Sequence, residues 1–262
     1  MELLAPAPLQ WLALCAAFWV AVFGFLQRAP EGVDRLRLPI GLALGAGFAH
    51  VGWGALHVAS LWQKPWALAD LGAGFSVLFV PLGLLASAPW CAEPDRRDAY
   101  LGAALGCLPL AQAVARLGCL VAGCCWGTPT DLPWGVRPPG ELTSRHPVPV
   151  YELAGLLALH LCLRSVRRER AAGPVLAGLG SLRLVLEPWR ATPPLGPPLV
   201  SPSALAVVWL LVGWTLYCVS SRRTGSFDTR CRCSAGCVDC RGARASGLSR
   251  GAVRTLQLPP SS

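Results

Sequence analysis

Two short polar segments stand out in a sequence that is otherwise strongly apolar. One runs from Arg116 to Gly127 and reads Arg-Leu-Gly-Cys-Leu-Val-Ala-Gly-Cys-Cys-Trp-Gly; the other runs from His146 to Glu152 and reads His-Pro-Val-Pro-Val-Tyr-Glu. Both lie at the ends of long apolar stretches, where ionisable side chains are costly and therefore indicate function. The Arg116 guanidinium suits a phosphate or carboxylate, and His146 or Glu152 could accept a proton. The segments predict an anion site with a base, although Arg116 could also simply extend to the outer headgroup layer.

A third polar group lies further along the chain. Arg183, Glu187 and Arg190 are spaced i, i+4 and i+7, so a helix would carry all three on one face. A net positive face in a lipid environment suits the phosphate of a phospholipid. The alternative is a self-neutralising pair of Arg183 with Glu187, with Arg190 extending to the interface.

The second segment opens an apolar span, and Pro147 suits the first turn of a helix there. Glu152 could act as a base, orient a neighbour or pair with an arginine. Tyr151 could equally be an interfacial aromatic residue at a polar helix start. Gly118 and Gly127 allow close approach of a ligand or of another helix, and glycines in membrane helices often serve packing alone.

Two groups of cysteines raise the question of a metal. Cys119, Cys124 and Cys125 could form a site with His146, but their spacing matches no common zinc pattern, and small apolar packing is the favoured interpretation. The C-terminal thiols could form a tetrahedral zinc site in a reducing compartment, or belong to a flexible tail, as the Arg/Ser/Gly composition favours. These thiols are Cys231, Cys233, Cys237 and Cys240. We expect no cofactor.

The composition indicates which elements position these groups. Of the 262 residues, 53% are hydrophobic and only 14% are charged, whereas soluble domains carry about 25% charged residues. Several uncharged runs exceed about 18 residues, which is enough to span a bilayer. We therefore expect an all-α polytopic membrane protein with about seven transmembrane helices. The expected spans are about 8–27, 38–63, 65–90, 99–122, 147–163, 172–189 and 198–219.

The distribution of positive charge predicts the orientation. Of the 23 lysine and arginine residues, 17 lie in one set of alternate loops and in the C-terminal tail, and basic loops remain in the cytoplasm. This places the N-terminus outside and the first two polar segments towards the outer face. The expected domains are a seven-helix membrane domain over 1–220 and a basic, cysteine-containing, disordered cytoplasmic tail over 221–262. Such a tail favours anionic lipid over nucleic acid as a partner.

Three motifs, in this order and spacing, resemble those of the prolipoprotein diacylglyceryl transferase family. The family has an arginine-leucine-glycine run ending in tryptophan or tyrosine and glycine, then His-Pro-x-Gln-x-Tyr-Glu, then Arg-Phe-x-x-Glu-x-x-Arg. They correspond here to residues 116–127, 146–152 and 183–190, and the resemblance covers about 71–190. Cys119 and Cys124 stand where the family has asparagine and glutamate, and Pro149 replaces the glutamine. Residues 74–83 lack the family's histidine, and no tyrosine precedes Tyr100.

The resemblance implies a bacterial inner-membrane transferase that acts without a metal. It would move a diacylglyceryl group from phosphatidylglycerol, or a similar phospholipid, to the cysteine thiol of a lipobox-containing prolipoprotein. Arg116 and Arg183 would hold the leaving phosphate, Glu187 would orient Arg183, and His146 or Glu152 would be the base. Substrate-binding roles are implied for Arg190, Tyr151, Gly118 and Gly127. Because part of the family's acid/base set is missing, a non-catalytic or repurposed phospholipid-binding homologue is the alternative, and a membrane thiol-redox or metal protein is a third possibility.

Overall fold

The computed structural model describes residues 8–29, 38–63, 65–69, 76–94, 96–138, 140–191 and 201–230. All regular secondary structure in these ranges is helical, and extended backbone pairs there only in isolated bridges. The α-helices are α1 (Pro8–Arg28), α2 (Leu38–Leu56), α3 (Val58–Gln63), α4 (Val80–Cys91), α5 (Arg97–Gly106), α6 (Leu108–Val121), α7 (Val148–Leu163), α8 (Ala172–Leu186) and α9 (Pro202–Arg230). Four 3-10 turns accompany them: η1 (Pro65–Leu68), η2 (Val77–Phe79), η3 (Arg168–Arg170) and η4 (Glu187–Trp189). The all-helical expectation is confirmed for this part of the chain.

Several expected spans are broken where the sequence interrupts a helix. The fourth is divided at Cys107, because Pro109 in the first turn of α6 has no backbone N–H to continue the hydrogen-bond ladder of α5. The second is divided at His57, between α2 and α3. In the described part of the third, the 3-10 turns η1 and η2 come first, and the α-helix begins at Val80. The seventh runs past its expected end to Arg230, with no proline after Pro202 to stop it before residue 259.

Among the described residues, two helical stretches are long and apolar enough to cross a membrane, Arg97–Val121 with 25 residues and Pro202–Ser221 with 20 residues. Four shorter apolar helices lie at Leu12–Arg28, Ile40–Leu56, Val77–Cys91 and Val148–Leu163. These ranges do not establish the predicted count of seven spans, which stays a prediction. Large apolar side chains are exposed on the outward helix faces, including Trp19, Phe23, Leu161, Leu211 and Trp214. Apolar surface of this extent is typical of a protein that faces lipid or a partner.

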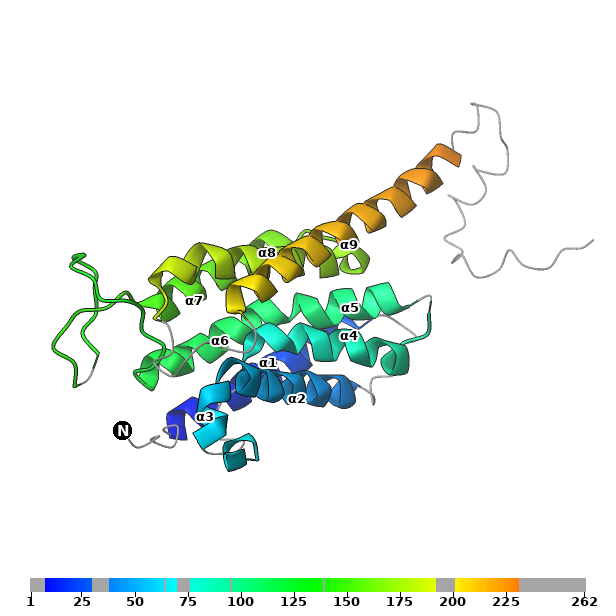
Figure 1. Ribbon diagram of the computed structural model, residues 1–262. Helices are drawn as coiled ribbons and strands as arrows, with labels where there is room; N and C mark the ends of the chain where they lie inside the picture. The colour runs from blue at the N-terminus through cyan, green and yellow to red at the C-terminus, as the bar shows by residue number, and fades with distance from the viewer. Residues whose placement is uncertain are drawn as a thin grey trace, which may run out of the picture. The chain divides into compact units, whose positions relative to one another are not determined.

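The packed centre of unit 1, Met1–Ser220, is built around Tyr100. Its ring is fully buried and meets Phe25 edge-on at 5.6 Å between ring centroids. The Tyr100 hydroxyl lies 2.8 Å from the Ser87 hydroxyl, which satisfies two buried polar groups at once. α6 packs against both α1 and α7, and α5 packs against α4 and α8 (Figure 1). This arrangement brings the end of α6 beside the start of α7.

α8 and α9 approach each other backbone to backbone. A Cβ added at Gly180 would lie 2.5 Å from the Ala206 carbonyl oxygen, and one added at Gly173 would lie 2.7 Å from that of Gly213. Glycines seven residues apart lie on one face of α8, so the contact runs along the helix. Small residues permit this close approach between membrane helices. The contact fixes α8, whose last turn carries Arg183.

The chain divides into two units, Met1–Ser220 and Ser221–Ser262. The backbone of α9 continues as helix through residues 221–230, so the first part of the expected disordered tail is helical. The four tail cysteines from Cys231 to Cys240 lie outside the described residues.

Candidate functional site

The site forms where α6 ends and α7 begins. Arg116 lies five residues before the end of α6, and Glu152 lies in the second turn of α7. Pro147 precedes the first helical residue of α7, where its missing N–H and restricted φ cost nothing. α6 and α7 pack closely along their lengths, so both ionisable side chains are held between two helices.

A buried carboxylate joins two arginines from different motifs. Glu152 is 7% exposed. Its Oε2 lies 2.6 Å from Arg116 Nε, and its Oε1 accepts a hydrogen bond from Arg190 Nη1. Both arginine side chains are largely buried as well, with 19% and 23% exposure. Arg116 therefore does not extend alone to a headgroup layer. The cluster of two guanidinium groups and one carboxylate has a net charge of +1, which suits one further anionic oxygen.

Arg183 and Glu187 form an ion pair within α8 and η4. Such a pair was one of the two interpretations of their spacing in the sequence, the other being a phosphate-binding helix face. Arg183 Nη2 lies 2.9 Å from Glu187 Oε2, and the Ser203 hydroxyl of α9 donates to Glu187 Oε1 at 3.1 Å. The Nε of Arg183 is buried and makes no hydrogen bond. An unsatisfied buried N–H is costly, so this nitrogen is ready to donate to a ligand oxygen. Ser203 was not foreseen, because it lies 16 residues away on another helix.

Backbone contacts hold the end of α8 against the loop that follows α6. The Thr128 amide donates to the Trp189 carbonyl oxygen at 2.9 Å, and the Gly127 amide donates to the His146 carbonyl oxygen at 2.9 Å. Gly127 also forms an isolated bridge with Arg190. A Cβ at Gly127 would collide with the Trp189 carbonyl oxygen and press on His146. Glycine is needed at this position for the three motifs to meet.

His146, Tyr151 and Trp189 form an aromatic group beside this contact. The Trp189 ring lies 6.1 Å from the His146 ring and 6.2 Å from the Tyr151 ring, centroid to centroid. Trp134 Nε1 donates to the Tyr151 hydroxyl at 2.9 Å, and that hydroxyl lies 3.4 Å from His146 Nδ1. Because the hydroxyl already accepts from Trp134, it can donate its own proton to His146. Trp134 and Trp189 were missed by the sequence reasoning, which considered only ionisable groups and the residues of the motif pattern.

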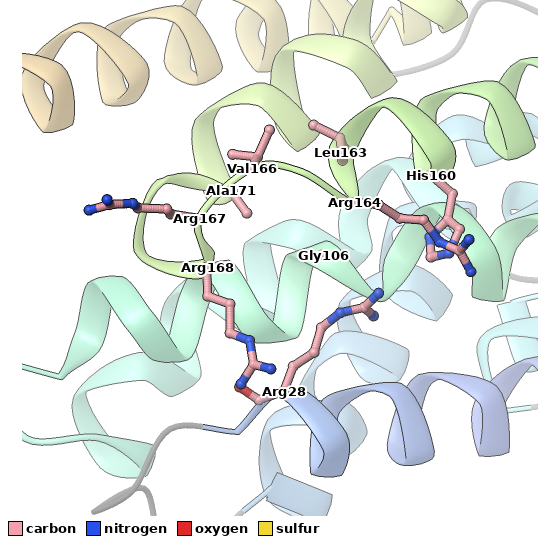
Figure 2. A pocket seen from close by; sticks show the side chains of 10 residues that line it. Arg28, Gly106, His160, Leu163, Arg164, Val166, Arg167, Arg168 and Ala171 are labelled. Atoms are coloured by element: carbon pink, nitrogen blue, oxygen red, sulfur yellow. The ribbon is translucent and has the colours of Figure 1, made fainter.

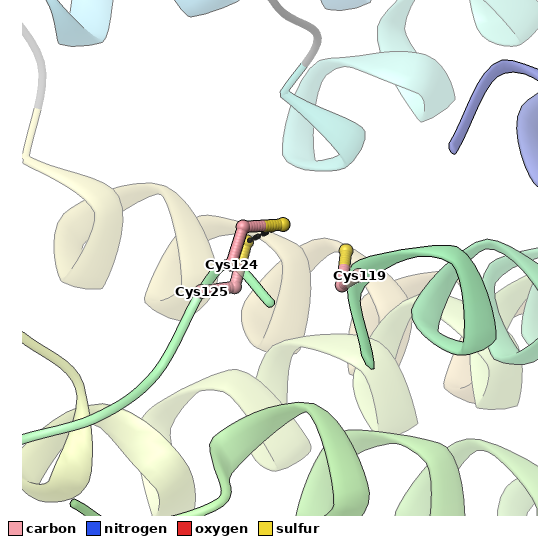
Figure 3. A group of neighbouring side chains, drawn as sticks. All are labelled: Cys119, Cys124 and Cys125. Atoms are coloured by element: carbon pink, nitrogen blue, oxygen red, sulfur yellow. Dashed lines mark hydrogen bonds between the residues drawn. The ribbon is translucent and has the colours of Figure 1, made fainter. Parts of the chain in front are cut away.

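Three thiols gather at the end of α6. The sulfur atoms of Cys119, Cys124 and Cys125 all lie within 4.8 Å of one another (Figure 3). Gly123 and Cys125 have φ of 65° and 63°, so the chain turns back on itself after the helix. The Arg116 Nη1 donates to Cys119 Sγ at 3.6 Å. The expectation of simple apolar packing for these cysteines does not describe them, because the thiols contact one another and an arginine.

Hydrogen bonds within this group change the acidity of its thiols. The contacts of Cys124 with Cys119 and then Cys125, followed by burial, raise the pKa of the Cys124 thiol well above its ordinary value. The contact with Cys119 also raises the pKa of Cys125. Both thiols are therefore neutral at physiological pH. All eight cysteines of the described residues are free.

The remaining predicted residue, Gly118, is buried in the last turns of α6, where its carbonyl oxygen accepts from the Ala122 amide at 2.9 Å. It supports the end of the helix.

A separate cavity of about 330 Å³ lies at the other end of α7 (Figure 2). Its polar lining consists of basic side chains: Arg28, His160, Arg164, Arg167 and Arg168. None of the predicted site residues lines it. His160 lies eight residues beyond Glu152 on α7, which corresponds to about 12 Å along the helix axis. The basic cavity and the arginine–glutamate cluster thus lie towards opposite ends of the same helix.

Comparison with known proteins identifies relatives. The family model described as prolipoprotein diacylglyceryl transferase matches residues 6–219. The chain is 34% identical over 116 residues to a phosphatidylglycerol–prolipoprotein diacylglyceryl transferase of Vibrio vulnificus, covering 40% of this chain and 42% of the relative. It is 39% identical over 88 residues to the protein of the same name from Bordetella parapertussis, covering 30% of this chain and 34% of the relative.

A third relative of this name, from Photobacterium profundum, is 32% identical over 118 residues, covering 42% of this chain and 44% of the relative. The chain thus spans less than half the length of these curated relatives. No solved structure matches it.

Proposed function

Because the chain belongs to the prolipoprotein diacylglyceryl transferase family, we propose that it moves a diacylglyceryl group from phosphatidylglycerol to the lipobox cysteine thiol of a prolipoprotein. One observation carries this proposal. Glu152 holds Arg116 and Arg190 together, so residues from all three motifs meet at one point. Burial of two guanidinium groups against one carboxylate at the edge of a bilayer costs desolvation free energy, so folding stability alone does not account for the cluster.

The reaction requires an anion site for the leaving group. The acceptor sulfur attacks the terminal glyceryl carbon, the bond from that carbon to the phosphate oxygen breaks, and glycerol phosphate leaves with the electron pair. Arg116 and Arg190, with a net charge of +1 after Glu152 is counted, stabilise the oxygen on which charge develops. The unpaired Nε of Arg183 supplies a further donor, and Glu187 with Ser203 fixes its guanidinium.

The acceptor thiol must lose its proton. Glu152 is already engaged by two arginines and is a poor base while it remains so. His146 is the better candidate, since its Nδ1 can receive a proton through the Tyr151 hydroxyl. In this scheme Tyr151 and Trp134 orient the imidazole, and Gly127 allows the aromatic group to approach the end of α8.

The same proposal includes the membrane setting. We propose seven spans in a bacterial inner membrane, with the N-terminus outside, the basic tail of residues 221–262 in the cytoplasm and the Glu152 cluster towards the outer leaflet. The arginines around the cavity at the far end of α7 support this orientation, because basic residues concentrate on the cytoplasmic side. An impermeant thiol reagent that labelled Cys231–Cys240 in intact cells would contradict it.

A phospholipid-binding protein without turnover is the second candidate. Its supporting observation is that Glu152, the carboxylate closest to the arginines, is occupied by Arg116 and Arg190. Such a protein would bind phosphatidylglycerol through the same cluster and leave an acceptor peptide unmodified.

The deciding experiment incubates the purified full chain with phosphatidylglycerol and a synthetic lipobox peptide, and reads the mass of the peptide. We expect one diacylglyceryl group per peptide, release of glycerol phosphate, and no product from a peptide with serine in place of cysteine. Arg116→Lys keeps the charge but loses the planar fork, so it should reduce product formation at least tenfold while the protein still folds. Binding of the lipid without any modified peptide would support the second candidate and overturn the first.

A further inference from the structure

The thiols of Cys119, Cys124 and Cys125 have the geometry of a metal site. Cys125 Sγ lies 3.6 Å from Cys124 Sγ, and all three sulfur atoms lie within 4.8 Å of one another. Three sulfurs bound to one zinc-like ion at about 2.3 Å would lie roughly 3.7–4.0 Å apart. Small side-chain rotations bridge this difference. The turn made by Gly123 and Cys125 sets the cluster in place before any ion binds.

We propose that these three thiols bind one thiophilic divalent cation of the zinc class, and that the open fourth position takes the thiol of the acceptor peptide. The binding of a metal by the three thiols is independent of the transferase function, whereas the acceptor thiol as fourth ligand rests on it. Three protein ligands with one exchangeable position are the usual composition of a catalytic zinc site. Cys125 is exposed and the other two are half-buried, so an ion and a fourth ligand can reach the cluster.

The charge of the surroundings favours such an ion. A divalent cation with three thiolates carries a net charge of −1. The neighbouring cluster of Arg116, Arg190 and Glu152 carries +1, and Arg116 contacts Cys119 Sγ at 3.6 Å. Before an acceptor thiolate binds, the loaded site and the arginine cluster would therefore be neutral together.

Coordination would also serve the chemistry. A thiol bound to a divalent cation gives up its proton, so the acceptor would arrive at the site as a thiolate without a strong protein base. Each of the four thiols that binds releases one proton to solvent; the cation compensates two of the four negative charges, and the arginine cluster compensates one more. The pairing of Glu152 with both Arg116 and Arg190 is then no obstacle to thiol attack.

The test uses Co²⁺ as a spectroscopic substitute for Zn²⁺. The full chain carries serine at Cys231, Cys233, Cys237 and Cys240, so that metal bound by the tail does not contribute. Reduced, metal-free protein in detergent is titrated with Co²⁺, and sulfur-to-cobalt charge-transfer absorption reports thiolate binding. We expect one Co²⁺ per chain, displaced by one Zn²⁺. Cys124→Ser should weaken binding at least tenfold, while Cys162→Ser, an exposed cysteine on α7, should leave it unchanged.

Three outcomes would overturn the proposal. These are no charge-transfer absorption in the parent, equal binding in the parent and in a Cys124→Ser variant of unchanged helical content, or a disulfide among the three cysteines that persists under the reducing conditions of the titration and prevents binding. A lipobox peptide should change the cobalt spectrum, and its serine analogue should not; equal spectra would refute the fourth-ligand assignment. If the peptide changes the spectrum but is never lipidated, the transferase proposal fails while the metal site stands.

Discussion

Removing the charge of Glu152 is the most informative perturbation of the site. Glu152→Gln keeps the size of the side chain but leaves Arg116 and Arg190 without their shared counter-charge. The three side chains are 9%, 19% and 23% exposed, so water replaces little of what is lost. Unit charges about 4 Å apart attract by about 4 kcal/mol at an effective dielectric constant near 20, which gives about 8 kcal/mol for two pairs.

Relief of the desolvation cost of Glu152 offsets part of that loss, and breaking a buried ion pair by removing one partner typically costs about 3–5 kcal/mol. A domain of this size loses about 2–4 °C in Tm per kcal/mol. We therefore expect the Tm of Glu152→Gln to fall by roughly 6–20 °C. Thermal unfolding of the detergent-solubilised protein, followed by circular dichroism, measures the change.

The matched control is Glu141→Gln. Glu141 also pairs with an arginine, Arg145, but its side chain is 40% exposed, so its loss should cost under about 1 kcal/mol. Addition of phosphatidylglycerol should raise the Tm of Glu152→Gln more than it raises the Tm of the parent, because a phosphate can replace the missing carboxylate. If Glu152→Gln unfolds at the same temperature as Glu141→Gln, the arginine cluster is not held by Glu152 and the reasoning about the site is wrong.

Three further expectations concern other parts of the structure. Gly127→Ala should lower the stability by about 1–3 kcal/mol through the collision with the Trp189 carbonyl oxygen, whereas Gly106→Ala, which has open space, should be neutral or stabilising in a Tm comparison. In metal-free protein the raised pKa of Cys124 keeps its thiol protonated, so its alkylation rate should still rise with each pH unit up to pH 9, as read by peptide mass; a plateau near pH 8 would contradict this. Ser203→Ala removes the hydroxyl that fixes Glu187. It should reduce transfer to the lipobox peptide by a few-fold, while the free energy of unfolding falls by only about 1 kcal/mol; a fully active variant would exclude a positioning role.

Local patterns predicted the elements that carry the site. Proline at 147 predicted the start of α7, and the i, i+4 spacing predicted the pairing of Arg183 with Glu187, both of which depend only on neighbours along the chain. The spacing also allowed Glu152 to pair with an arginine, but gave no means to decide between Arg116 and Arg190. The structure has both, because Glu152 has two carboxylate oxygens and each faces a different helix end.

The thiol cluster and the aromatic group could not be predicted in this way. Three cysteines converge only because the chain reverses after α6 through positive φ at Gly123 and Cys125, and a non-glycine residue gives little sign in sequence that it will adopt that conformation. Trp134 reaches Tyr151 across a loop of irregular backbone, where no periodicity applies. Such contacts depend on tertiary packing, which a single sequence reveals poorly.

The two partners of Glu152 also set an order of assembly during synthesis. Arg116 and Glu152 belong to adjacent helices, α6 and α7, and can pair as soon as that hairpin enters the membrane. Arg190 lies 38 residues beyond Glu152 and emerges from the ribosome only after α8 has been made. Until then Glu152 balances a single arginine and the half-built site is neutral. Under the proposed function, the extra positive charge that would attract a phospholipid phosphate appears only when α8 docks.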